Sequence, residues 1–157
     1  MPPSVFSKKD ETILKILKNL ELSVDTDIIC VSVSKNITSI RAFKELVSHL
    51  SDPTDILISS VGKTTITVLL HEKFLEKAKS IFGKDIQDIN VKVGAIFLKC
   101  STEVNTTSGI TAFISSLFAD KNITIYELIV TYTDYVIVVN EKEAYKMASF
   151  IQRILED

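Results

Sequence analysis

The sequence has few of the residues from which catalytic and metal sites are usually built. It contains four glycines, two cysteines and two histidines among 157 residues. These glycines form no phosphate-binding loop, dinucleotide-binding pattern or nucleophile elbow. His71 has no second histidine four residues on, so His71-Glu72 is interpreted as a solvated strand end. We predict a protein that is not an enzyme and that holds neither a metal nor a cofactor.

Long apolar runs and an excess of charge of one sign are also lacking. No stretch approaches the ~18 apolar residues of a membrane span, and the N-terminus shows no basic segment followed by a long apolar run. The formal net charge is only -2, which gives no sign of a nucleic-acid surface, while 46% hydrophobic residues can form a real core. We expect a cytoplasmic protein that binds neither membrane nor nucleic acid, with Cys30 and Cys100 as buried thiols.

An internal repeat organises most of the chain. A shift of 70 positions superposes identical residues without a gap. The superposed pairs are Cys30 and Cys100, Ile40 and Ile110, Ala42 and Ala112, Phe43 and Phe113, Thr54 and Thr124, Val68 and Val138, Ala78 and Ala148, and Ile81 and Ile151. The same order of elements accompanies these identities, so we interpret the chain as a duplicated unit.

Hydrophobic periodicity predicts the elements of each copy. In the first copy, strands are expected at 27–34, 56–61, 64–70 and 87–93, and helices at 38–50 and 72–82. In the second copy, strands are expected at 93–101, 123–130 and 135–139, and helices at 108–119 and 141–155. A further helix at 8–20 could cover a sheet edge or a partner, and its Lys8-Lys9 side is interpreted as a solvated face.

The predicted fold class is α+β, with two tandem ferredoxin-like βαββαβ units. Right-handed crossovers would place both helices of a unit on one face of an antiparallel sheet. The expected domains are an N-terminal helical extension at 1–24, a first unit at 25–93 and a second unit at 94–157. The second copy lacks a final strand after its last helix, so either the first half of the chain or a partner chain would have to supply one.

The second copy resembles an ACT domain, the small amino-acid-sensing module of aspartate kinases and other enzymes of amino-acid metabolism. The resemblance depends on SGITAFISSLFADKNITI, with its small residue before glycine, apolar helix, polar loop and Ile-x-Ile segment. It continues in YVIVVNEKEAYKMASFI, where an acidic turn leads into a helix with a buried alanine, here Ala148. The resemblance therefore extends from Asp27 to the C-terminus.

The turn before the helix at 108–119 is the candidate binding site. The first backbone N–H groups of a helix lack intrahelical partners, and they can hold a carboxylate. Glycine at 109 would let a ligand approach the backbone. In ACT domains the effector lies between this turn and the first hairpin strand of an adjoining unit. The resemblance therefore implies a site formed by Asn105, Thr107, Ser108, Gly109 and Ile110, with Thr124 and Glu127 on the strand side.

A purely structural interpretation of this turn is also open. Ser108 would then only cap the helix, and Gly109 would only allow tight packing. In the first copy, Ser39 takes the place of Gly109 under the shift of 70 residues, so we expect that copy to be the poorer binder.

Three functional hypotheses follow from these observations. The first is a non-catalytic, allosteric regulatory module that binds an amino acid or similar small effector at ACT–ACT interfaces and forms a homodimer. The alternative is a structural or interaction protein that pairs with an enzyme of amino-acid biosynthesis and binds no small ligand. A small enzyme on a ferredoxin-like scaffold is the third, because a fold alone does not determine function.

Overall fold

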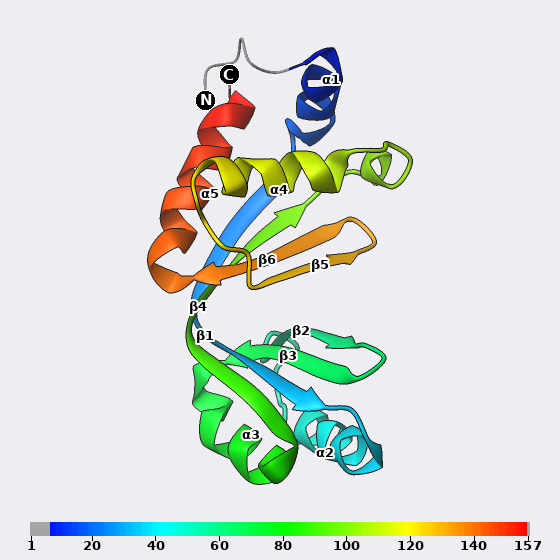
Figure 1. The fold of residues 1–157 in the computed structure, drawn as a ribbon, viewed down its shortest axis with the longest axis vertical. Helices are drawn as coiled ribbons and strands as arrows, with labels where there is room; N and C mark the ends of the chain where they lie inside the picture. The colour runs from blue at the N-terminus through cyan, green and yellow to red at the C-terminus, as the bar shows by residue number, and fades with distance from the viewer. Residues whose placement is uncertain (1–6, 157) are drawn as a thin grey trace. The chain divides into compact units, whose positions relative to one another are not determined.

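A computed structural model describes residues 7–156 and shows an α+β protein with antiparallel strand pairs (Figure 1). The first six residues of the predicted extension and Asp157 lie outside the described residues. The helices are α1 (Lys8–Leu17), α2 (Ile37–Ser48), α3 (Leu75–Phe82), α4 (Ile110–Asp120) and α5 (Glu141–Glu156). The strands are β1 (Glu21–Ser34), β2 (Ile56–Val61), β3 (Thr65–His71), β4 (Ile86–Lys99), β5 (Glu127–Thr131) and β6 (Asp134–Asn140). Within residues 7–156, no helix is both long and apolar enough to span a membrane.

The chain folds into two compact units. The central unit comprises Asp27–Val93, and the terminal unit comprises Met1–Thr26 together with Gly94–Asp157. Strands β1 and β4 are long, and each passes from one unit into the other along the chain. The predicted 1–24 extension is thus helical over Lys8–Leu17 but becomes strand from Glu21.

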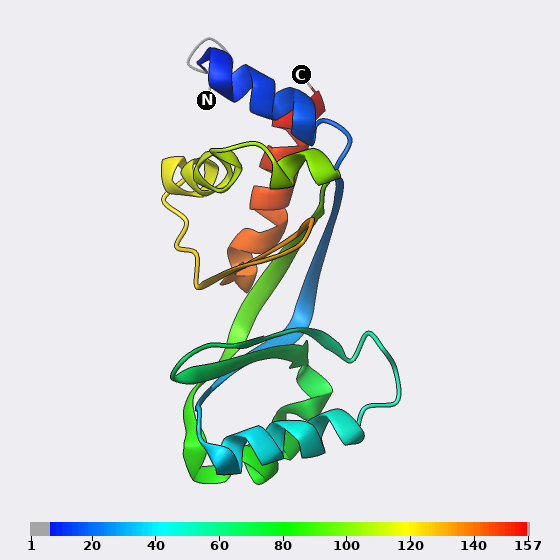
Figure 2. The ribbon, with the colours of Figure 1, turned by 90° about the vertical axis from the view of Figure 1, so that its right-hand side faces the viewer.

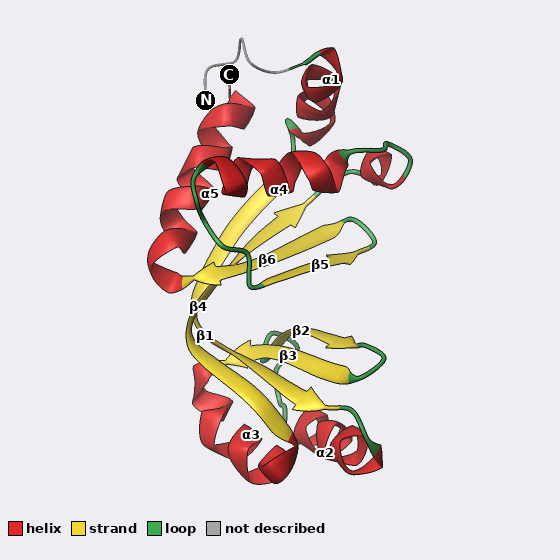
Figure 3. Ribbon diagram, in the orientation of Figure 1, coloured by secondary structure: helices red, strands yellow, loops and turns green. Residues whose placement is uncertain are grey.

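The central unit has the element order β1-α2-β2-β3-α3-β4 and the strand order β2-β3-β1-β4. Its β1–β3 and β2–β3 pairs are both antiparallel. Figure 3 shows α2 and α3 on the same face of these strands. Buried side chains from both helices and from β1 and β3 form one core, which consists of Ile29, Val31, Val33, Ala42, Leu46, Ile66, Val68, Leu70, Ala78 and Phe82. Alternate strand residues face this core, as expected for a sheet covered on that side by helices.

The terminal unit has the strand order β1-β4-β6-β5 and holds α1, α4 and α5. The chain itself therefore supplies the missing fourth strand, as residues 21–26 of β1 lie in this unit. Figure 2 shows α1 beside α4, and both helices contribute to the core. The largest fully buried side chains of that core are Ile13, Ile96, Leu98, Ile114, Phe118, Ile137 and Met147.

Three local predictions differ from the structure. The strands expected at 87–93 and 93–101 form the single strand β4. The strand expected at 123–130 begins only at Glu127, because Ile123 and Ile125 pack on the helix-side core from an irregular segment. Helix α2 begins at Ile37, which is three residues earlier in the repeat than the Ile110 start of α4. The shift of 70 residues therefore does not align the two helix starts.

Candidate ligand-binding site

The turn before α4 has a backbone conformation that favours glycine. Gly109 is the N-cap residue, with φ 89° and ψ 0°, a left-handed conformation that other L-residues rarely adopt. Helix α4 starts at the next residue, and no described side chain accepts a hydrogen bond from its first N–H groups. Ser108 is exposed and does not cap the helix, contrary to the purely structural interpretation of that residue. The start of α4 is thus an uncapped, partially positive helix end.

Local hydrogen bonds hold the preceding segment. A short 3-10 helix, Thr102–Asn105, follows β4, and Asn105 at its end is exposed. The Thr107 hydroxyl donates a 2.8 Å hydrogen bond to the Glu103 carbonyl oxygen. Ile110 points into the core and is 2% exposed. Among the predicted site residues of this turn, Asn105 and Ser108 therefore present exposed side chains, while the Thr107 hydroxyl has a backbone partner.

Helix α1 lies against this turn, which the sequence did not reveal. The Lys9 Nζ donates a 3.3 Å hydrogen bond to the Ser108 Oγ. A Cβ atom added to Gly109 would lie 3.0 Å from Lys9 Cε and 3.5 Å from Ile13 Cδ1. Ile13 is 1% exposed and belongs to the core of the terminal unit, so α1 is anchored there. Gly109 thus permits a close packing contact as well as a tight turn, and Lys9 faces the turn instead of forming part of a purely solvated face.

The strand-side residues lie away from the turn. Thr124 is exposed in the segment between α4 and β5, where it lines a cavity of about 320 Å³ with Tyr126, Asn140 and Lys142. It follows the C-terminal end of α4, whereas Gly109 precedes the N-terminal end. Eleven residues separate these ends, about 16 Å at 1.5 Å per residue. Thr124 and the turn therefore do not form one site within the terminal unit.

Glu127 is the first residue of β5 and is partly buried, and this burial raises the pKa of its carboxyl group. The next residue, Leu128, packs on the helix-side core. Because side chains alternate along a strand, Glu127 lies on the opposite face of the sheet. No hydrogen bond or ion pair joins the Glu127 carboxylate to another side chain in the described chain. Its negative charge is therefore uncompensated and partly desolvated.

The corresponding helix start of the central unit is closed by its own side chains. Asn36 caps α2, and its Oδ1 accepts a 2.8 Å hydrogen bond from the Ser39 N–H. The Ser39 Oγ accepts a 2.9 Å bond from the Asn36 N–H and completes a capping box. Ser39 is fully buried in the first turn of α2, so it does not occupy the position of Gly109. This cap leaves fewer free donors at α2 than at α4, and weaker ligand binding by the first copy stays a prediction.

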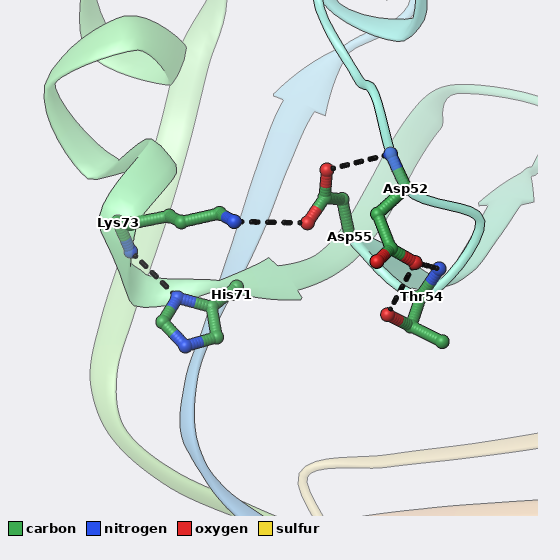
Figure 4. A network of polar contacts seen from close by, with 5 residues as sticks. All are labelled: Asp52, Thr54, Asp55, His71 and Lys73. Atoms are coloured by element: carbon green, nitrogen blue, oxygen red, sulfur yellow. Dashed lines mark hydrogen bonds and ion pairs between the residues drawn. The ribbon is translucent and has the colours of Figure 1, made fainter.

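A second polar cluster lies in the central unit, at the turn before β2 (Figure 4). The Asp55 carboxylate accepts a 3.2 Å bond from the Asp52 N–H and lies 3.1 Å from Lys73 Nζ. Burial alone would raise the pKa of Asp55, but these bonds more than offset it and hold that pKa below its ordinary value. The His71 Nδ1 accepts a 3.1 Å bond from the Lys73 N–H. We attribute a structural role to this cluster, because its bonds fasten the turn to the end of β3.

Metal ligands and reactive thiols can also form a site, and residues 7–156 contain two cysteines, Cys30 and Cys100. That part of the chain has no cluster of three histidine, cysteine or carboxylate side chains arranged to hold a metal ion. Cys30 and Cys100 are buried, as expected. Burial, with a smaller contribution from Asp134, raises the pKa of the Cys100 thiol to about 11. Cys100 is therefore protonated and a poor nucleophile at neutral pH.

Comparisons with known proteins give structural matches only. No protein-family model matches the chain, and no curated protein matches it significantly. The aspartokinase alpha and beta subunits superpose with a TM-score of 0.69 at 10% identity, covering 87% of this chain and 97% of that one. The regulatory subunit of aspartate kinase from Thermus thermophilus gives 0.66 at 10% identity, covering 85% and 95%.

A third solved structure is not described as part of a kinase. It is a Vibrio cholerae protein of unknown function, a possible transport protein, with a TM-score of 0.63 at 15% identity and coverage of 94% and 99%. Such low identities establish a shared fold and no more. The predicted resemblance is confirmed at that level: this chain has the fold of the regulatory regions of aspartate kinases.

Proposed function

We propose that the chain is a non-catalytic regulatory protein built from two ACT-type, ferredoxin-like units. Each unit has helices packed on a four-stranded arrangement, in the orders β2-β3-β1-β4 and β1-β4-β6-β5. In this proposal residues 27–93 form the first unit and residues 94–157 the second, which is completed by residues 21–26 of β1. The likeness to regulatory subunits of aspartate kinase supports the assignment.

The proposed ligand is an amino acid or a similar small zwitterion, and the uncapped start of α4 carries this proposal. The free N–H groups after Gly109 suit a carboxylate, and Ser108 and Lys9 offer two further donors beside them. Glu127 offers the opposite charge, which suits an ammonium group. A single ligand therefore has a complementary partner for each of its charges.

The distance between the Gly109 turn and Thr124 leads us to propose that two units assemble around one ligand. The turn and Thr124 lie at opposite ends of α4, so one site that uses both must draw them from two adjoining ACT units. We propose a cytoplasmic homodimer in which the turn of one unit faces the strand-side residues of the next. Ligand binding would then favour one packing of the units and alter any enzyme bound to them.

Calorimetric titration tests the binding step. Each common amino acid is titrated into the full chain, and one of them is expected to give saturable heat that is lost in Ser108→Tyr. The matched control is Ile37→Tyr at the capped start of α2, because Ile37 is 64% exposed. If no amino acid binds while sedimentation still shows a dimer, the sensing proposal fails and the assembly proposal stands.

The alternative is an interaction protein that binds no small ligand. The contact of Lys9 and Ile13 with the Gly109 turn favours it, because the chain itself covers part of the proposed site. Its partner would be an enzyme of amino-acid biosynthesis that lacks a regulatory region. Co-purification of such an enzyme, unaffected by added amino acids and by Ser108→Tyr, would favour this alternative.

A further inference from the structure

Helix α5 borders a hollow at the other end of α4. Lys121, Ile123 and one side of α5 border a hollow of about 830 Å³, within the range of 300–1,000 Å³ typical of small-molecule sites. Three apolar side chains line it: Met147 and Phe150 of α5 and Ile123 of the preceding segment. Met147 is 1% exposed and lies beneath the hollow, whereas Phe150, which is 8% exposed, and the partly exposed Ile123 form its apolar floor. An apolar group could therefore lie against this floor.

The rim of the hollow is positively charged. Lys121, Lys146 and Arg153 line it together with one acidic residue, Glu143. Glu143 lies 3.9 Å from Lys146 and compensates that charge. Lys121 Nζ lies 4.2 Å from the centre of the Phe150 ring, a cation–π contact that holds the ammonium group over the floor. Within residues 7–156, neither Lys121 nor Arg153 has a carboxylate partner, so two positive charges remain available to a ligand.

We propose that this hollow binds a small organic anion with an apolar body. The anionic group would be held by Arg153 and Lys121, and the apolar body would lie on Phe150 and Ile123. Arg153 offers planar, two-pronged donors suited to a carboxylate or a phosphate. The hollow shares no residue with the Gly109 turn, although Lys121, Ile123 and Glu143 also line the cavity beside Thr124. Arg153 lines the hollow and not that cavity, so an Arg153 variant tests this site separately from the proposed amino-acid site.

Phenyl phosphate is the probe for this site, because it combines an anionic group with a flat apolar body. Its Kd is measured with the full chain by calorimetry, beside those of inorganic phosphate and phenol. We expect saturable 1:1 binding that is tighter than for either fragment. Arg153→Gln and Lys121→Gln should each raise the Kd about tenfold, the effect of losing one charge-assisted hydrogen bond.

Arg41→Gln is the matched control, since Arg41 is an exposed cation on α2 and should leave the Kd unchanged. Both rim residues are exposed, and urea midpoints equal to that of the wild type would show that the variants fold. The proposal is overturned if phenyl phosphate does not bind, if phenol binds as tightly, or if neither rim variant weakens binding. Amide chemical shifts that change at 105–110 instead of at 146–153 would also overturn it.

Discussion

Gly109 shows how one residue can serve both backbone geometry and packing. Its φ of 89° suits the turn into α4, and its missing side chain admits Lys9 of α1. The sequence indicated the turn, because a small residue and glycine precede a helical apolar pattern. It did not indicate the contact with α1, because Lys9 and Gly109 are far apart in the chain and nothing local links them.

Gly109→Ala should destabilise the protein by about 1–2 kcal/mol, the usual cost of a left-handed conformation at a residue other than glycine. The added Cβ would also lie only 3.0 Å from Lys9 Cε. Urea unfolding measures the change, with Ser108→Ala as the adjacent control. The double variant with Lys9→Ala separates the backbone cost from the packing cost. Lys9→Ala removes the contact with the added Cβ atom but leaves residue 109 in its left-handed conformation. A Gly109→Ala variant as stable as the wild type would contradict the assigned turn conformation.

Asp55→Asn should lower stability at neutral pH, since the Lys73 ion pair and the bond from the Asp52 N–H both require the carboxylate. The pKa of Asp55 is lowered in the folded state from its ordinary value of 3.8. Its contribution is therefore fully present above pH 3.8 and is lost as pH falls through the lower folded pKa.

The measurement is the difference in urea midpoint between the wild type and Asp55→Asn at several pH values. It should shrink below pH 3.8. Asp88→Asn, at an exposed carboxylate, is the control and should show little difference at any pH. If the difference in urea midpoint stayed constant down to the lowest pH, it would argue against a contact made by the ionised Asp55 carboxylate.

Glu127→Gln should have the opposite effect at neutral pH and stabilise the fold. Burial raises the folded pKa of Glu127 above its ordinary value of 4.5, so the folded state holds the proton more tightly than the unfolded state. The resulting destabilisation of the wild type is absent below pH 4.5 and is complete above the raised pKa. Unfolding at pH 4 and pH 7 should show a gain only at the higher pH. Equal stability of the wild type and Glu127→Gln at pH 7 would contradict the assignment of Glu127 as an uncompensated, partly desolvated carboxylate.

At the scale of elements, α1 is part of the terminal unit. Its Ile13 and Leu17 side chains are 1% and 2% exposed, and a capping box of Ser7 and Asp10 fixes its start. Periodicity predicted this helix but left open whether it covered a sheet edge or a partner. The answer depends on tertiary contacts with α4 that no local pattern contains.

Ile13→Ala should cost about 2–5 kcal/mol, the range for removing a large aliphatic side chain from a core. Lys15→Ala, on the exposed side of α1, is the control and should change stability by less than about 0.5 kcal/mol. Both values come from urea unfolding of the full chain. A loss below about 1 kcal/mol for Ile13→Ala would show that α1 is not packed as described.

The repeat predicted most elements but misplaced the start of β5 and did not align the starts of α2 and α4. An apolar Ile-x-Ile segment is typical of a strand, yet Ile123 and Ile125 reach the core without joining the sheet, and β5 starts at Glu127. The capping box at Asn36 begins α2 earlier than the shift of 70 residues implies. In both places a specific side-chain contact determined the boundary, and hydrophobic periodicity does not record such contacts.

At the scale of the whole molecule, duplication of the sequence explains why there are two units. It does not explain why the terminal unit combines residues from both ends of the chain. The sequence predicted consecutive units and left open whether the first half of the chain or a partner supplies the last strand of the second unit, and residues 21–26 of β1 supply it. Continuous strands such as β1 and β4 cannot be assigned to one unit by period alone, because alternation continues across the boundary. The candidate turn was predictable from its glycine and helix start, while its covering by α1 was not.

The most direct test of the account is the calorimetric titration of amino acids into the wild type, Ser108→Tyr and Ile37→Tyr. The proposed site at the start of α4 predicts saturable binding of one amino acid to the wild type and to Ile37→Tyr, and loss of that heat in Ser108→Tyr. Absence of binding to the wild type, or binding that persists in Ser108→Tyr, would contradict it.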